Sequence, residues 1–343
     1  MPVRVESGAV RAGVCLALAL AVFACPVSGA EVWIHPVLPP AAAKGAPTPP
    51  VRRGARPARP TPVAPAWPFP TAVSGESSLV ELTAGERYPE PGSAVPPERI
   101  DRTFVRLGEG RPMPLTSARA DGAVTRLEAT WAGQGLATLA VLLTPEARTA
   151  EAADFEDFLR DWDASAAAAE RSKRKETKKA AKVVAFESAR AFVGVAPPPR
   201  SADPADPSAA TDAPLGLPLE LVAGLPPLPL RVGATLKATV LLEGQPSPGA
   251  TVRAFTAEGP AHAALVADAQ GVVSLPLARE GRLLLATASI RRTTKADRAK
   301  GEAWKKADWE IRRATLELLV LPAPPAPTAA PTPKGKRPTP KPR

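Results

Sequence analysis

Residues 235–255 read TLKATVLLEGQPSPGATVRAF, and residues 266–290 read VADAQGVVSLPLAREGRLLLATASI. From Leu236 to Leu242, apolar residues alternate with polar ones, which is the period-two pattern of a half-buried strand. Glycine and proline interrupt the pattern at 244–249, as a turn requires. A second turn at 268–271 precedes another alternating run, 273–277. Short strands separated by turns predict an antiparallel β-sandwich.

The same alternation occurs earlier in the chain. It predicts strands over 79–83, 100–107, 123–131 and 136–143, and a longer strand over 183–195. These segments predict a first sandwich, and the stretch quoted above belongs to a second one. The last predicted strand begins at Trp309 and continues through Leu316, Leu318 and Val320. The fold class is therefore mainly β, with two sandwich domains.

A helical segment interrupts the first predicted sandwich. Phe155, Phe158, Leu159 and Trp162 fall at the i, i+3, i+4, i+7 spacing of one helical face. We expect this face to dock on the first sandwich. The lysine-rich run RSKRKETKKAAK, 171–182, predicts a second, hydrated helix, with all of 146–183 forming a helical insertion.

These patterns divide the chain into seven parts. The prediction is a signal peptide at 1–30, a first strand at 31–35, a Pro/Arg-rich linker at 36–74, a first sandwich at 75–196, a Pro-rich linker at 197–216, a second sandwich at 217–321 and a disordered basic tail at 322–343.

The net charge of +10 is located in the two proline-rich arms of the chain. The first arm carries Lys44, Arg52, Arg53, Arg56 and Arg59; the second carries Lys334, Lys336, Arg337, Lys341 and Arg343. Neither arm contains an acidic residue, and the region between them is neutral. This distribution argues against a nucleic-acid-binding face. Clustered cations on extended chain instead suggest a tether to anionic envelope polymers, or simply a solubilising tail.

The first thirty residues have the pattern of an export leader. Arg4 and Arg11 precede the apolar run 14–24, and Ser28-Gly29-Ala30 supplies small residues at a cleavage position. We predict cleavage after Ala30 and a periplasmic or cell-surface location. A competing interpretation is a lipoprotein anchored through Cys25. Cleavage after Ala30 removes both cysteines, and no disulfide is then possible.

Few residues are suited to catalysis. The two histidines are His35 and His262, and we expect His262 to be an ordinary loop residue. A histidine triad or zinc site needs several convergent groups, so we predict that the chain is not an enzyme. The α-amine of a cleaved chain could join Glu31 and His35 in holding Ni²⁺ or Cu²⁺. The alternative for His35 is the end of a strand leading into Pro36.

The order of several loose motifs resembles an exported family of unknown function that is often labelled a nickel-uptake substrate-specific component. The motifs are Glu31-Val32-Trp33-Ile34-His35-Pro36, Ala84-Gly85-Glu86-Arg87-Tyr88-Pro89, Leu217-Pro218-Leu219-Glu220-Leu221-Val222, Glu243-Gly244-Gln245-Pro246, Ala267-Asp268-Ala269-Gln270-Gly271 and Ala307-Asp308-Trp309-Glu310. The resemblance also includes the helical excursion with Phe155 and Leu159 and the run 176–182 that leads into a strand.

The resemblance implies immunoglobulin- or transthyretin-like sandwiches in an envelope protein. It also implies an accessory role in Ni²⁺ or Co²⁺ uptake beside a membrane transporter component. Members of the family often carry a histidine just before the first acidic residue, where this chain has Ala30. The long proline insert after His35 is a second departure.

Overall fold

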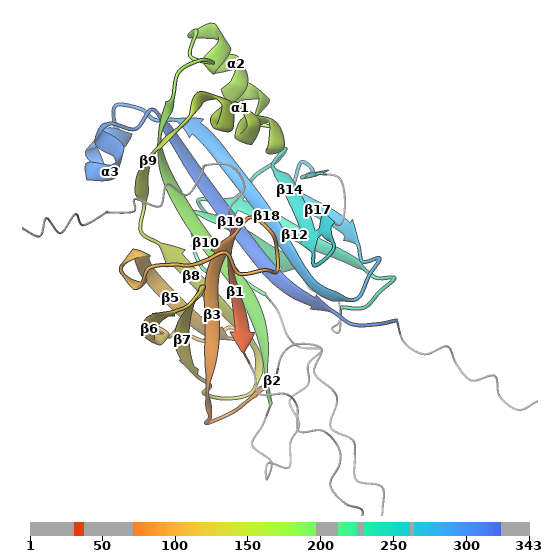
Figure 1. The fold of residues 1–343 in the computed structure, drawn as a ribbon. Helices are drawn as coiled ribbons and strands as arrows, with labels where there is room; N and C mark the ends of the chain where they lie inside the picture. The colour runs from red at the N-terminus through yellow and green to blue at the C-terminus, as the bar shows by residue number, and fades with distance from the viewer. Residues whose placement is uncertain (1–30, 38–70, 197–211, 225–229, 261–263, 324–343) are drawn as a thin grey trace, which may run out of the picture.

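A computed structural model describes residues 31–37, 71–196, 212–224, 230–260 and 264–323. The described residues form three β-sheets with a small helical cap (Figure 1). The mainly β, sandwich-like fold class is therefore confirmed. The predicted leader, Cys25, His262 and most of the proline-rich arms lie outside the described residues. Within the described ranges, no helix is long and apolar enough to cross a membrane.

The elements follow one another in this order: β1 (Glu31–Val37), β2 (Thr71–Val73), β3 (Ser77–Gly85), β4 (Ser93–Ala94), the short helix η1 (Pro97–Arg99), β5 (Ile100–Leu107), β6 (Thr116–Asp121), β7 (Val124–Thr130), β8 (Gly135–Leu143), β9 (Glu146–Ala150), α1 (Ala152–Asp161), α2 (Ser165–Lys173), β10 (Ala181–Ala196), β11 (Leu219–Gly224), β12 (Thr235–Leu242), β13 (Gln245–Pro246), β14 (Thr251–Thr256), β15 (Gly259–Pro260), β16 (Leu265–Val266), β17 (Val272–Pro276), β18 (Gly281–Arg292), the short helix η3 (Asp297–Ala299), α3 (Glu302–Lys305) and β19 (Trp309–Val320).

One central sheet connects the two halves of the chain. Its order is β15-β14-β18-β19-β10-β8-β5. The long strand β10 pairs in parallel with β19, from Val183 opposite Trp309 to Ala191 opposite Glu317. Strand β19 also pairs antiparallel with β18 along its whole length. The two predicted sandwiches therefore share a sheet, and the boundary predicted at 197–216 does not separate two independent sets of strands.

A smaller sheet covers each half of the central sheet. The sheet β1-β3-β7-β6 lies over β10, β8 and β5, and its core contains Ile34, Leu82, Leu127 and Val193. The sheet β11-β12-β13, joined by β17, lies over β14, β18 and β19. Phe192 of β10 belongs to this second core. The two cores thus draw on the same central strands, as expected when one sheet serves both sandwiches.

The helical cap is shorter than predicted and sits elsewhere. Phe155, Phe158, Leu159 and Trp162 are buried, as their spacing requires, but they pack with Ala286, Trp309 and Ile311 of the central sheet. The helices therefore cover β18 and β19 as well as β10 (Figure 1). Burying aromatic side chains of this size is worth roughly 1.5–3 kcal/mol each.

Three boundaries need correction. The insertion predicted at 146–183 begins with β9 and holds helices only at 152–161 and 165–173; β10 starts at Ala181. The hydrated helix predicted at 171–182 is wrong, because α2 ends at Lys173. Its residue Arg171 is buried, and the guanidinium donates a hydrogen bond to Glu156. The linker predicted at 36–74 is too long at both ends. Strand β1 extends to Val37, and residues 71–73 form β2, which pairs in parallel with β10.

Candidate functional site

The sequence-predicted residues Glu31 and His35 lie in what we call the β1 junction, where β1 meets the central sheet. Strand β1 lacks the usual alternation because both of its faces are covered: Val32 and Ile34 enter the first core. Successive side chains of a strand point to opposite faces, so Glu31, Trp33 and His35 share the other face. That face lies against β18 and β19, where Thr315 Oγ1 donates a hydrogen bond to the Val32 carbonyl at 2.5 Å.

His35 forms one end of the junction. Its Nδ1 lies 2.9 Å from Oε1 of Glu317, a buried carboxylate on β19. The guanidinium of Arg282 donates to both oxygens of Glu317, at 2.8 and 3.1 Å. The Arg282 guanidinium also lies 5.4 Å from the centre of the Tyr88 ring. Burial, then the nearby Glu317 carboxylate, raise the pKa of Tyr88 far above its ordinary value.

Trp33 forms the middle of the junction. Its indole meets Tyr88 edge-on, with ring centroids 5.5 Å apart, and both rings pack with Leu284. Gly85 lies directly against the indole: a Cβ there would come within 2.8 Å of the ring and 3.0 Å of the Glu90 carbonyl oxygen. Any side chain at position 85 would force the indole or the Glu90 carbonyl to move, which favours glycine there.

Glu31 forms the other end. Only 7% of its surface is exposed, and its Oε2 has no hydrogen-bond partner among the described residues. Burial raises the pKa of the Glu31 carboxyl; the charge of Arg313 opposes that shift and the charge of Glu187 adds to it. An acid in this state is a costly arrangement for a folded protein, because ionisation places an incompletely paired charge away from water.

Glu187 of β10, close to Glu31, has the opposite balance. Burial alone would raise its pKa, but Arg313, Arg148 and Arg99 together lower it. Arg313 binds one of its oxygens directly, and the other oxygen lies 3.5 Å from both Arg99 and Arg148. The pKa of Glu187 is therefore lowered and that of Glu31 raised, because three arginines act on Glu187 and only two on Glu31.

The structure does not bring the two predicted metal ligands together. Glu31 and His35 are four residues apart in one strand, which places them about 13 Å apart at roughly 3.3 Å per residue. Within the described ranges, no three potential ligands from His, Cys, Asp and Glu gather at one point. His35 instead places one imidazole nitrogen beside a carboxylate, an arrangement that can contribute a single metal ligand.

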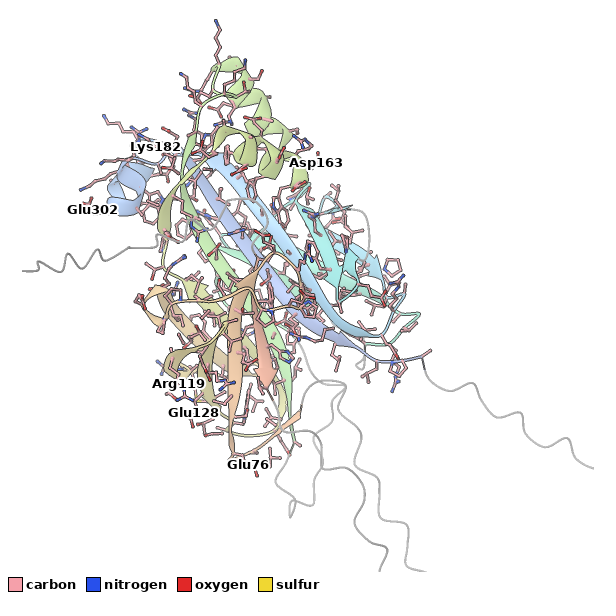
Figure 2. The ribbon with its side chains drawn as sticks, viewed as in Figure 1. Glu76, Arg119, Glu128, Asp163, Lys182 and Glu302 are labelled. Atoms are coloured by element: carbon pink, nitrogen blue, oxygen red, sulfur yellow. The ribbon has the colours of Figure 1, made fainter. Side chains whose placement is uncertain are left out.

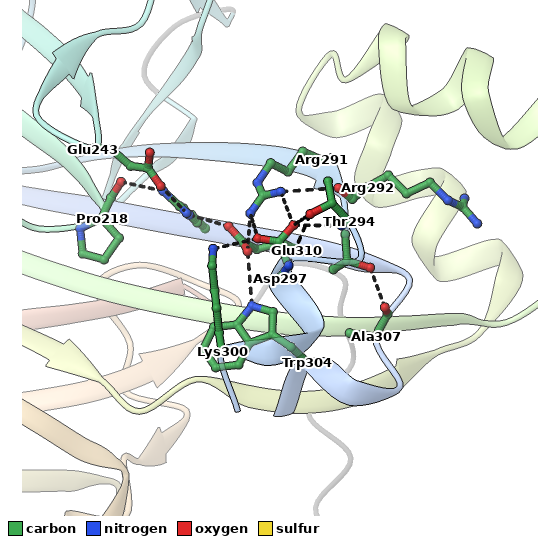
Figure 3. A network of polar contacts seen from close by, with 12 residues as sticks. Pro218, Glu243, Arg291, Arg292, Thr294, Asp297, Lys300, Trp304, Ala307 and Glu310 are labelled. Carbon is green, nitrogen blue, oxygen red and sulfur yellow. Dashed lines mark hydrogen bonds and ion pairs between the residues drawn. The ribbon is translucent and has the colours of Figure 1, made fainter. Parts of the chain in front are cut away.

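Residues 291–308 read RRTTKADRAKGEAWKKAD, a composition that predicts a long, basic loop. A second polar network fixes this segment (Figure 3). Arg291 donates to both oxygens of Asp297, at 2.7 and 2.9 Å, and to Glu310 at 2.6 Å. Lys300 lies 2.7 Å from the same Asp297. The hydrogen bonds from Arg291 and Lys300 hold the pKa of Asp297 well below its ordinary value.

Glu310 of β19 links Arg291 of β18 to Trp304 and Arg312. It accepts hydrogen bonds from Trp304 Nε1 at 3.2 Å and from Arg312 at 2.7 Å. Arg312 in turn lies 2.7 Å from Glu243 in the β12–β13 turn. Arg291 and Arg292 belong to β18, so the predicted loop is shorter at its start and charge-paired there.

A third network fastens the described end of the predicted linker. Arg190 of β10 lies 2.5 Å from Asp212 and 3.0 Å from Glu220, and all three side chains are almost completely buried. Asp212 accepts the amide of Ala223 at 2.9 Å, and Glu220 accepts the amide of Leu215 at 2.7 Å. The predicted linker therefore ends as a fixed part of the body. We call Arg190, Asp212 and Glu220 the linker clamp.

The charged residues of β19 and the linker clamp are not among the candidate residues predicted from the sequence. The signal was present in residues 309–317, WEIRRATLE, where charges occur at both parities of an apolar strand. A strand of that pattern is either solvated on one face or paired with opposite charges inside the protein. Here the opposite charges come from β18, β10 and the β12–β13 turn: Arg282 pairs with Glu317, Arg291 with Glu310, Glu187 with Arg313 and Glu243 with Arg312.

The labelled side chains of Figure 2 mark the periphery of the body. Glu76, Arg119 and Glu128 belong to the rim of the first sandwich, and Glu302 to α3. The buried ion pairs described above lie inside this rim. Several of them join strands that are distant in the sequence, such as Arg313 of β19 with Glu187 of β10.

Three solved structures illustrate weak similarity to this chain. Native Escherichia coli alpha-2-macroglobulin is 14% identical over 75% of this chain and 14% of its own, with a TM-score of 0.22. The D0-D1 domain of intimin is 12% identical over 73% and 95%, with a TM-score of 0.18. An ICAM-5 ectodomain fragment is 12% identical over 75% and 50%, with a TM-score of 0.19. Similarities at these TM-scores do not define a shared overall fold.

No curated protein matches the chain. A family model does match, over residues 67–291, which is about two thirds of the sequence. The match includes most of both sandwiches, the helical cap and the linker clamp, and it ends at Arg291 before β19. The chain belongs to the family described as a domain of unknown function, DUF4198.

Proposed function

We propose that this chain is an exported, non-catalytic accessory protein of the cell envelope, which acts by binding a partner rather than by transforming a substrate. The observation that carries the proposal is how the described body uses its buried charges. Glu187, Asp297, Glu310 and Glu317 each lie against arginine, and Asp212 and Glu220 share Arg190. Acids and bases held in such pairs stabilise strand contacts and are poorly placed for proton transfer.

The export part of the proposal rests on the leader pattern, Arg4 to Ala30. Fractionation of cells that carry the tagged full chain tests this part. The proposal predicts protein in the periplasmic or surface fraction with the leader removed. Protein that remains in the cytosol with residues 1–30 attached would refute it.

A narrower form of the proposal is assistance to Ni²⁺ or Co²⁺ uptake beside a membrane transporter component. Its support is the sequence resemblance together with His35, whose imidazole lies at the edge of the body at 29% exposure. Isothermal titration of Ni²⁺ and of Co²⁺ into residues 31–343 tests it, with His35→Gln as the matched control. Binding that the control loses supports the metal role. No heat at tens of micromolar metal removes that role and leaves the accessory role standing.

An alternative function is structural: the basic arms would tether the body to anionic envelope material. The supporting observation is that the two arms carry the whole net charge of +10. Clustered cations bind polyanions in a salt-dependent way. Deletion of 322–343 should then release the protein from the envelope fraction at low salt, and unchanged fractionation would count against the tether.

A further inference from the structure

We propose that leader removal completes the β1 junction: the new α-ammonium group of Glu31 becomes the ionic partner of the buried Glu31 carboxylate. This inference rests on the proposed export, and it adds a structural purpose to the cleavage position. The site is the start of β1, and its ligand is the chain's own amino terminus. Processing then adds one positive charge beside a buried acid at the start of β1.

The first support is the unsatisfied carboxylate oxygen. Glu31 is more than nine-tenths buried, and its Oε2 has no hydrogen-bond donor among the described residues. Native proteins rarely leave such an oxygen without a partner, because the loss of water is then not compensated. Glu31 is also the residue whose own nitrogen changes chemically on cleavage, so the missing donor and the orphan oxygen belong to one residue.

The second support is the charge balance nearby. Arg313 is the cation with the largest charge effect on Glu31, but it also binds Glu187 directly. Arg253, the other cation that acts on Glu31, lies 5.2 Å from the centre of the Phe255 ring and 5.8 Å from that of Trp162. The pKa of Glu31 stays above its ordinary value in spite of both arginines. An additional cation at the strand end would act against the effect of burial and lower the pKa of Glu31.

The covalent step is the hydrolysis of the Ala30–Glu31 peptide bond by a signal peptidase. Water adds its hydroxyl to the Ala30 carbonyl carbon as the carbon–nitrogen bond breaks, and its hydrogen goes to the Glu31 nitrogen. The resulting amine then takes up a proton at neutral pH, since the ordinary pKa of an α-amino group is about 8. The carboxylic acid on Ala30 releases a proton and leaves with the leader.

The inference distinguishes the two export routes open in the sequence. Processing at Cys25 would leave residues 25–30 in front of β1, and the Glu31 nitrogen would remain a neutral amide with a single hydrogen. The buried carboxylate would then keep its orphan oxygen. Only cleavage after Ala30 places a charged donor at the start of the strand.

The test is a cycle of four proteins. One pair begins at Glu31, and the other begins one residue earlier, at Ala30, which moves the ammonium group along the chain. Each pair compares Glu31 with Glu31→Met, a side chain of similar length that cannot ionise and, unlike glutamine, does not cyclise at an amino terminus. Glu128→Met on the rim serves as the control in both backgrounds (Figure 2). Thermal unfolding at pH 7 is the measurement.

The effect of Glu31→Met on Tm should have opposite signs in the two backgrounds, or vanish in the one that begins at Ala30. Glu31→Met should lower Tm by about 2–8 °C in the protein that begins at Glu31, because it removes the partner of the ammonium group. The same substitution should leave Tm unchanged or raise it in the protein that begins at Ala30, because it removes an orphan buried oxygen. The advantage of the Glu31 amino terminus should also disappear as pH rises through the pKa of the amine.

Amino-terminal sequencing of the exported protein keeps the two levels of the proposal separate. A chain that is not exported refutes the proposed function, and the inference with it. An exported chain that begins elsewhere than Glu31 refutes the inference alone. An exported chain that begins at Glu31, but in which Glu31→Met acts with the same sign in both backgrounds, also overturns it.

Discussion

Replacement of Arg190 by methionine is the most informative single change in the linker clamp. Arg190 is 1% exposed, and its guanidinium holds Asp212 at 2.5 Å, Glu220 at 3.0 Å and the Leu221 carbonyl at 2.6 Å. Methionine fills much of the same space without the charge. Two carboxylates would then be buried with a reduced complement of cations.

The cost can be estimated from these contacts. Breaking a buried ion pair by removing one partner costs about 3–5 kcal/mol, because the other charge is left uncompensated. Two acids depend on Arg190, so we expect Arg190→Met to cost at least about 4 kcal/mol. For a body of this size, each kcal/mol lowers Tm by about 2–4 °C, which gives a fall of about 10 °C or more.

Urea unfolding followed by tryptophan fluorescence measures this cost, since Trp33, Trp131 and Trp309 are all buried. A triple variant, Arg190→Met with Asp212→Asn and Glu220→Gln, is the matched control. Neutral amides no longer need the cation, so the triple variant should recover a large part of the loss. A cost below about 1 kcal/mol for Arg190→Met would refute the reasoning, because that is the range of a solvent-exposed pair.

Three further predictions follow from the packing and the ion pairs. Gly85→Ala should cost about 1–3 kcal/mol, because the added methyl group meets Trp33 and the Glu90 carbonyl; wild-type urea stability would contradict the close approach. Phe158→Ala should cost about 3–5 kcal/mol and expose the helical cap to protease before the sheets, whereas Asp161→Ala, at an exposed position of α1, should have little effect. Asp297 has a lowered pKa in the folded protein, so its stabilisation is present above its unfolded pKa of about 4 and is lost as pH falls. Asp297→Asn should therefore cost about 1.5–3 kcal/mol at pH 7 and much less near pH 2; a cost independent of pH would exclude the ionic explanation.

The fold class could be predicted because its signals are local. Period-two runs mark β12, β14 and β17, and the i, i+3, i+4, i+7 stripe marks α1, as the structure confirms. The turns at 244–249 and 268–271 could also be predicted, because glycine allows positive φ and proline fixes φ at about −65°.

The shared sheet could not be predicted in the same way. Pairing of β10 with β19 joins residues 126 positions apart, such as Val183 and Trp309, and no local pattern encodes a partner strand. The Pro-rich stretch between the halves instead suggested two separate domains. The structure replaces that expectation with one central sheet fastened by the linker clamp.

The site was predictable only in part. Sequence patterns singled out Glu31 and His35 as chemically capable residues close to the predicted amino terminus. The residues that act on them lie on β19, near the other end of the chain. Glu317 contacts the imidazole of His35, and the charge of Arg313 acts on the Glu31 carboxyl. Glu31 and His35 point to the same face of β1, but their spacing of four residues along the strand keeps them about 13 Å apart.

Cleavage of the chain between its two halves tests the shared sheet most directly. A single protease site introduced within 197–211 can be cut in the folded, full-length protein, and the product can be analysed by native size-exclusion chromatography. The β10–β19 pairing and the linker clamp predict that both fragments elute together at the size of the intact chain and separate only in denaturant. Two fragments that separate in native buffer, each folded by circular dichroism, would show that the halves are independent and would contradict the single central sheet.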